Sequence, residues 1–268
     1  MKSLTAILLA SLSLGACATA GKPSGALSSY EGLTPRAGTV RTGIAERKDE
    51  AELAAVRRVF VEPARMAAGP QTGWLDDKER ALLLREMDAQ MCFEITERYE
   101  LTYDPAQADA RVRAVVTRVK PTGRVASTAS AAAGFFIPGP IGVRVPGTLG
   151  GLGAEAEMVT PKGRQLAALV WNRDATALGT DDPSLSRLGD ALQFAEPFAD
   201  VAAATMTPKG LKARKIASGE DPCAQYGARF RPEGFIAGMA SGLYVPGMSG
   251  AKPLPKDAAP APVTDGGA

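Results

Sequence analysis

The sequence predicts an α+β domain in which a mostly antiparallel sheet of four or five strands carries two helices on one face. Three patterns favour this class: a long amphipathic stripe of helical period, a strand with strict alternation, and a hairpin with a compact turn. A sheet with helices packed on one face buries the apolar side of both kinds of element. A long Gly-rich apolar segment between two of the strands is the unusual feature.

The folded part is expected to open with a β-rich strand over residues 56–61 and to continue into a long helix. Asp76 and Glu79 have the spacing of a capping box, in which each side chain accepts from the backbone of the other. Apolar residues then recur every three or four positions, which is the period of one helix face. They are Leu83, Leu84, Met87, Met91, Ile95 and Tyr99.

Two further strand patterns follow. Over residues 110–120, small and branched residues alternate with arginines, and the phase slips at Arg118-Val119, which predicts a bulge. Residues 154–158 and 166–170 alternate in the same way around the turn 160–163, which predicts a hairpin.

Glu155 and Glu157 of this hairpin share one strand face, about 7 Å apart. We expect that face to be exposed to solvent. A carboxylate-based enzyme is the alternative, which would need a cleft around the pair.

A second helix is predicted over residues 185–206, which Pro197 should kink or divide because proline lacks the N–H that a helix interior needs. The basic residues that follow are expected to form a solvated helix end. They are Lys209, Lys212, Arg214 and Lys215.

The amino terminus has the pattern of an export signal. Lys2 precedes an apolar run over residues 4–14, too short to span a bilayer. The ending Leu14-Gly15-Ala16-Cys17 resembles a bacterial lipobox, in which the cysteine is acylated and becomes the first mature residue. The alternative is an ordinary signal peptide with Cys17 incidental. Ala18, where an aspartate would favour the inner membrane, points to the outer membrane.

The chain therefore divides into four parts. Residues 1–16 are the expected signal peptide, and residues 17–50 a flexible lipid-anchored tether. Residues 51–245 are the expected single α+β domain, within which residues 226–245 have no functional interpretation. Residues 246–268 are Pro- and Ala-rich and expected to be disordered.

Two cysteines remain after Cys17. Thiol pairs of exported proteins usually oxidise, so Cys92 and Cys223 form a candidate disulfide. The alternative is two separate buried thiols that pack as small apolar side chains.

The Gly-rich segment over residues 123–153 contains a cluster of large apolar residues and almost no charge. The cluster is Phe135, Phe136, Ile137, Ile141 and Val143. Long loops in compact domains are often functional, so these side chains are candidates for contact with a partner protein or with lipid. The alternative is a connection that folds back over the sheet.

Composition argues against several classes of function. The chain has 31 basic and 29 acidic residues and no histidine. This near balance does not favour a nucleic-acid partner, and the lack of imidazole removes the commonest general base and zinc ligand. We expect no metal site, no cofactor and no enzymatic activity.

Three stretches resemble a family of bacterial lipoproteins catalogued as domain of unknown function 3313. They are the lipobox, the element Gly25-Ala26-Leu27-Ser28-Ser29-Tyr30-Glu31-Gly32-Leu33-Thr34-Pro35, and the hairpin over residues 155–170. The resemblance implies an envelope-anchored α+β domain and brings no catalytic residue. The expected function is that of an outer-membrane lipoprotein, facing the periplasm, which binds or scaffolds envelope components. The runner-up is an accessory subunit of an envelope transport or secretion assembly.

Overall fold

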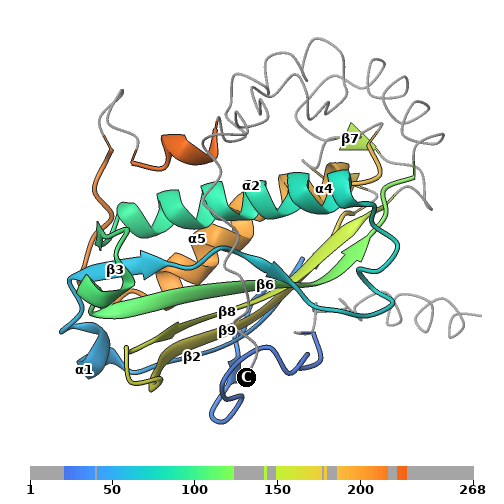
Figure 1. Ribbon diagram of the computed structural model, residues 1–268. Helices are drawn as coiled ribbons and strands as arrows, with labels where there is room; N and C mark the ends of the chain where they lie inside the picture. The colour runs from blue at the N-terminus through green and yellow to red at the C-terminus, as the bar shows by residue number, and fades with distance from the viewer. Residues whose placement is uncertain are drawn as a thin grey trace, which may run out of the picture.

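The computed structural model describes residues 21–39, 41–123, 149–176, 186–216 and 222–227 in full, and residues 142–143 and 178–179 through their backbone. They form an eight-stranded sheet, a separate two-stranded pair and a layer of helices (Figure 1). The mixed α+β class is confirmed. The expected four or five strands are wrong, because several strands are only two residues long and show no periodic pattern.

The strands of the large sheet run in the order β1-β2-β9-β8-β6-β3-β5, with β4 beside β6. Pairing is antiparallel from β1 to β6 and parallel for β3, β4 and β5. Their bounds are β1 (Thr34–Pro35), β2 (Thr42–Lys48), β3 (Arg58–Val61), β4 (Arg65–Met66), β5 (Glu100–Leu101), β6 (Ala110–Lys120), β8 (Gly151–Val159) and β9 (Gln165–Asp174). The small sheet pairs β7 (Gly142–Val143) with β10 (Leu178–Gly179).

Local patterns placed the long strands well. The strand expected over residues 110–120 is β6, and its register shifts between Val116 and Arg118, at the expected bulge. The expected hairpin is β8 and β9, with the N–H of Gly163 donating to the carbonyl of Thr160 across the turn.

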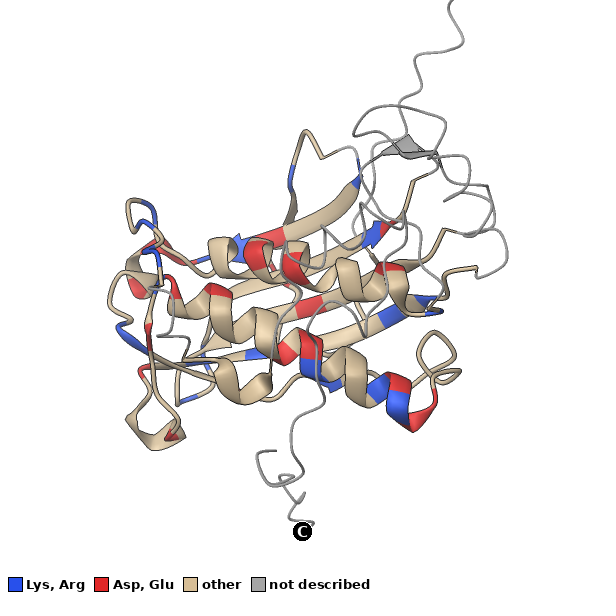
Figure 2. Ribbon diagram, turned by 90° about the horizontal axis from the view of Figure 1, so that it is seen from above, with Lys and Arg blue, Asp and Glu red and all other residues tan. Residues whose placement is uncertain are grey.

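Helices lie over one face of this sheet (Figures 1 and 2). They are α2 (Asp77–Thr96), α4 (Gly189–Gln193) and α5 (Ala195–Thr205). The short α1 (Glu50–Leu53) lies at one end of the sheet, and single 3₁₀ turns form η1 (Pro105–Gln107) and η2 (Ala224–Tyr226). The capping box of Asp76 and Glu79 is confirmed at the start of α2.

The single helix expected over residues 185–206 is two helices, α4 and α5, which meet at Phe194. The helix is divided, as one of the two expected effects of Pro197, but the division lies three residues earlier, at Phe194. Pro197 lies in the first turn of α5, where a backbone N–H has no helical partner and its loss costs little.

The main core fills the space between the sheet and α2, α4 and α5. Trp171 of β9 and Phe198 of α5 meet there edge to face, with ring centroids 5.6 Å apart. Both side chains are fully buried, so this contact joins the two layers.

The amino-terminal part differs from the expected flexible tether. Within residues 17–50, β2 is a full strand of the sheet and pairs with β9 over seven residues. Residues 21–33, which we call the N-terminal strap, lie on the face of the sheet opposite the helices. Leu27 is buried there against Ala168 and Val170 of β9. The folded domain therefore begins well before residue 51.

Candidate functional site

The N-terminal strap is fastened at one point by Glu155 of β8. This carboxylate accepts two hydrogen bonds from Ser24, one from the backbone N–H and one from the hydroxyl, both at 2.8 Å. The hydroxyl of Tyr30 donates a third. The alternation of β8 aims Glu155 at this face, and the strap supplies the donors.

Glu157 fastens the strap at a second point. It accepts from the backbone N–H and hydroxyl of Ser28 at 2.9 and 2.6 Å, and from the side-chain amide of Gln165 at 2.8 Å. The guanidinium of Arg113 lies 3.6 Å from its other oxygen. Both oxygens of Glu157 are thus in contact with protein groups.

The expected solvent exposure of this face is wrong at these two residues. Glu155 is 1% exposed and Glu157 is 2% exposed, because the strap covers them. Their donors come from the strap and from neighbouring strands, and neither residue lines the pocket described next. The pair that would carry a carboxylate mechanism is engaged in fastening the strap.

A pocket of about 400 Å³ opens where the strap begins. Its walls are the strap residues 21–24, the loop 67–71, and the sheet surface around Thr117, Gly153 and Asn172. Gly153 keeps the floor open, because a Cβ there would lie 3.0 Å from the Cβ of Arg118.

Charged, polar and apolar residues all line this pocket. Lys22 and Arg118 line it, and a carboxylate of Asp174 accepts from the Arg118 guanidinium at 2.5 Å. Oδ1 of Asn172 is buried there without a hydrogen-bond partner among the described residues. Such an orphaned acceptor is costly unless a donor reaches it. The sequence patterns gave no sign of this pocket, since its walls come from three distant segments.

Asp190 clamps the two ends of the apolar segment that leaves β6 and returns to β8. Its carboxylate accepts from the hydroxyl of Thr122 at 2.9 Å and from the N–H of Gly150 at 2.7 Å. A Cβ on Gly150 would lie 2.6 to 2.9 Å from three oxygen atoms, so only glycine fits. Asp190 is fully buried, so this junction holds the two ends of the segment in place.

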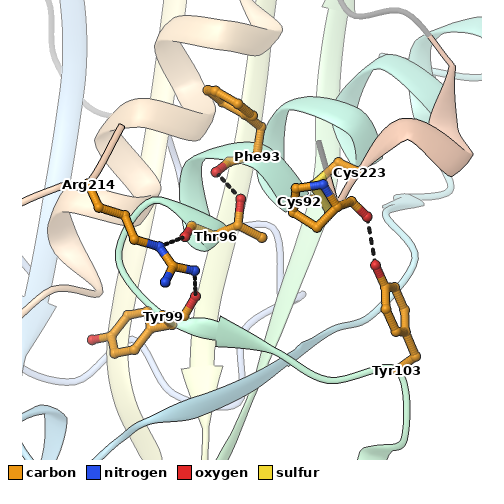
Figure 3. Close-up of a disulfide and its surroundings, with 8 residues drawn as sticks. Cys92, Phe93, Thr96, Tyr99, Tyr103, Arg214 and Cys223 are labelled. Carbon is orange, nitrogen blue, oxygen red and sulfur yellow. Dashed lines mark hydrogen bonds between the residues drawn. A yellow bond between two sulfur atoms is a disulfide. The ribbon is translucent and has the colours of Figure 1, made fainter. Parts of the chain in front are cut away.

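The disulfide between Cys92 and Cys223 is confirmed, with Cα atoms 5.9 Å apart (Figure 3). It lies in a small apolar cluster with Ala89 and Tyr226, against Phe93. The hydroxyl of Tyr103 donates to the carbonyl of Pro222 at 2.6 Å beside it. Residues 207–216 and 222–227, which we call the C-terminal strap, are thereby bonded to α2.

Arg214 fastens the same strap at the end of α2. Its backbone N–H donates to the carbonyl of Glu97 at 2.8 Å, and its guanidinium donates to the carbonyls of Thr96 and Tyr99 at 3.0 and 3.4 Å (Figure 3). The carbonyls of Thr96 and Glu97 end α2 and lack helical partners. Arg214 is exposed, as expected, and it also caps α2.

Asp88 is a half-buried acid of α2 that sequence patterns did not single out. The N–H of Ala64 donates to it at 2.6 Å. Burial raises the pKa of Asp88 to about 7, and this hydrogen bond opposes the rise only in part. Burial first, and then the charge of Asp88, raise the pKa of Tyr226 in the C-terminal strap. The two groups are thus electrostatically coupled.

Several predicted site residues lie outside the described residues. These are Cys17, Phe135, Phe136, Ile137 and Ile141, while Val143 is described only through its backbone in β7. In the described part of the chain, no three His, Cys, Asp or Glu side chains gather in a way that could bind a metal ion. No helix among those residues has the length and apolarity to cross a membrane.

Solved structures with a similar arrangement are distant. The PelC dodecamer from Paraburkholderia phytofirmans matches with a TM-score of 0.36 and 7% identity, over 63% of this chain and 99% of that one. A DUF4136 family protein from Bacteroides thetaiotaomicron matches with a TM-score of 0.33 and 10% identity, over 63% of this chain and 98% of that one. No curated protein gives a match.

A family model described as "Protein of unknown function (DUF3313)" matches residues 22–202. The match begins inside the N-terminal strap and ends inside α5, so it spans the strap, the sheet and the helices that cover it. The chain belongs to the DUF3313 family.

Proposed function

We propose that this protein is an outer-membrane lipoprotein, anchored through acylated Cys17 and facing the periplasm, which binds or scaffolds envelope components without catalysis. The disulfide between Cys92 and Cys223 is the observation that carries this proposal. Disulfides form and persist in oxidising compartments such as the periplasm. The export signal and lipobox over residues 1–17 supply the route and the anchor.

The roles of the acidic side chains support a non-catalytic function. Glu155 and Glu157 fasten the N-terminal strap, and Asp190 holds together the two ends of the apolar segment. These buried carboxylates therefore join segments that are far apart in sequence.

Metabolic labelling with a fatty acid, followed by membrane fractionation, tests the anchor. The unaltered protein should take up label and sediment with outer membranes. Cys17→Ser should take up none and should lose the membrane or keep its signal peptide, whereas Cys92→Ser should still be labelled. Label in Cys17→Ser would contradict the lipoprotein proposal.

An accessory subunit of an envelope transport or secretion assembly is the second candidate. The junction at Thr122, Gly150 and Asp190 favours it, because it holds together the two points between which the apolar segment is inserted in the chain. Phe135→Ser with Phe136→Ser tests this role. Near-normal thermal stability with lost crosslinking to envelope proteins would support a contact surface. A large fall in melting temperature would show that both rings belong to the core.

A further inference from the structure

The N-terminal strap determines how far the domain can lie from its anchor. Gly21 is already beside the sheet, since a Cβ on it would lie 3.7 Å from Oδ1 of Asn172. Only three residues lie between it and Cys17, which makes four residue-to-residue steps. An extended chain spans at most about 3.5 Å per residue, so Gly21 lies within about 14 Å of the acylated residue. A flexible tether to residue 50 would have allowed several times this distance.

The strap also determines which end of the sheet is near the anchor. It runs along β8, from Ser24 at Glu155 to Ser28 at Glu157. Gly21 therefore lies toward the end of the sheet where Lys120 pairs with Gly151 and Leu152 with Arg173. We call this the pocket end, because the pocket of about 400 Å³ opens there. The turn at Lys162 lies at the opposite end.

Basic residues are in excess at the pocket end of the sheet. Five basic residues lie there with two carboxylates: that of Asp174, which pairs with Arg118 and Lys120, and that of the buried Asp190. The five are Lys22, Arg41, Arg118, Lys120 and Arg173, whose guanidinium lies over the ring of Phe194.

Neighbouring parts of the chain do not offset this excess. The first turn of α2 and the arginine that pairs with it are balanced, with Asp76, Asp77 and Glu79 against Lys78, Arg80 and Arg187. The segments outside the described residues add Arg124 and Arg144 against Asp181 and Asp182. The opposite end of the sheet carries charges of both signs, with Lys48, Lys162 and Arg164 near Asp49, Glu50 and Glu52, and with Arg57 and Arg58 at Asp109.

We infer that the pocket end of the sheet is a membrane-facing surface that contacts the anionic headgroups of phospholipids. The inference rests on the proposed acylation of Cys17. Basic side chains are attracted to anionic lipid within a Debye length of about 8–10 Å, and a short anchor brings these residues into that range. Lys22, exposed at the mouth of the pocket, is the closest of them in sequence to the anchor.

A quenching experiment on the lipidated full-length protein tests this orientation. One fluorophore is attached through Lys120→Cys at the pocket end, and another, in a separate variant, through Lys162→Cys at the opposite turn. The two sites are separated by about 30 Å, the length of a nine-residue strand. Each labelled protein is inserted into vesicles of equal phosphatidylcholine and phosphatidylglycerol with a quencher on the lipid headgroup. Strong quenching is expected at position 120 and little at position 162.

Charge variants and lipid composition sharpen the test. Lys22→Glu should reduce the quenching at position 120 at least twofold, and vesicles of phosphatidylcholine alone should do the same. The matched control, Lys212→Glu on the C-terminal strap, should leave it unchanged. Equal quenching at positions 120 and 162 on protein that carries the acyl mass would overturn the orientation while the anchor stands. Protein without acyl mass that stays off the vesicles would overturn the proposed function and this inference together.

Discussion

The two straps attach distant segments to the domain by different chemistry. The N-terminal strap lies on the outer face of the sheet and is attached by hydrogen bonds from Ser24, Ser28 and Tyr30 to two buried carboxylates. The C-terminal strap lies on α2 and is attached by a disulfide and by Arg214. One attachment is polar and reversible, and the other is covalent under oxidising conditions.

Only one of the two attachments depends on the compartment in which the protein folds. The N-terminal strap can form wherever the chain folds, because hydrogen bonds need no oxidant. The C-terminal strap reaches its full stability only after oxidation of Cys92 and Cys223. The following predictions test each attachment separately, starting with the largest expected effect.

Removing the disulfide should have the largest effect. Cys92→Ala with Cys223→Ala releases a link between residues separated by 131 positions. In the chain-entropy model, such a link contributes about 4–5 kcal/mol to the free energy of unfolding. Denaturant unfolding of oxidised and variant protein measures it. Oxidised and reduced unaltered protein provide the matched comparison, and a loss below about 1 kcal/mol would show that the strap is held without the covalent bond.

Asp88 should make stability depend on pH beside the C-terminal strap. The pKa of Asp88 is about 7 in the folded protein, above the ordinary value of 3.8. The folded state therefore holds a proton that the unfolded state releases, and stability falls as pH rises from about 4 to about 7, by at most about 1.4 kcal/mol per pH unit.

Asp88→Asn removes this ionisation. The variant should be more stable than the unaltered protein at pH 8, by about 1 kcal/mol or more, with no gain at pH 4. Thermal unfolding across this range checks the difference. If the variant and the unaltered protein have the same thermal stability at pH 4 and at pH 8, Asp88 is hydrated in solution and not buried.

Breaking the N-terminal strap should cost less stability than removing the disulfide. Glu155→Gln replaces a charged acceptor by a neutral amide opposite the donors of Ser24 and Tyr30, so a loss of about 2 kcal/mol is expected. Hydrogen exchange at the backbone amide of Ser24 should accelerate, while the amide of Arg214 stays protected. The exposed Glu31→Gln is the control. Unchanged exchange at Ser24 would show that apolar contacts alone retain the strap.

Removing the helix cap should have the smallest effect. Arg214→Ala removes the guanidinium that donates to the carbonyls of Thr96 and Tyr99, and water replaces part of the lost hydrogen bonding, while the backbone N–H of residue 214 can still donate to Glu97. We expect a loss of about 1 kcal/mol, against none for the neighbouring exposed Lys212→Ala. Chemical denaturation of both variants compares them directly. Equal losses would argue against a capping role.

Sequence patterns alone were sufficient to predict the elements that depend on residues close together in the chain. The capping box at Asp76, the alternation along β6 and the β8–β9 hairpin depend on residues within a few positions of one another. The candidate disulfide between Cys92 and Cys223 was found by counting, although the spacing could not show that they meet. The straps, the two-residue strands and the pocket lacked any such local signal.

What the sequence by itself determined is therefore the type of the long elements, the capping of α2 and the identity of the two cysteines. Only the tertiary structure decided which surfaces are covered. Glu155 lies on a strand face that alternation alone marks as exposed, and it is buried by Ser24, 131 positions away. Burial depends on what packs against a residue, and a hydrogen-bonded segment from the far end of the chain leaves no periodic trace beside the strand that it covers.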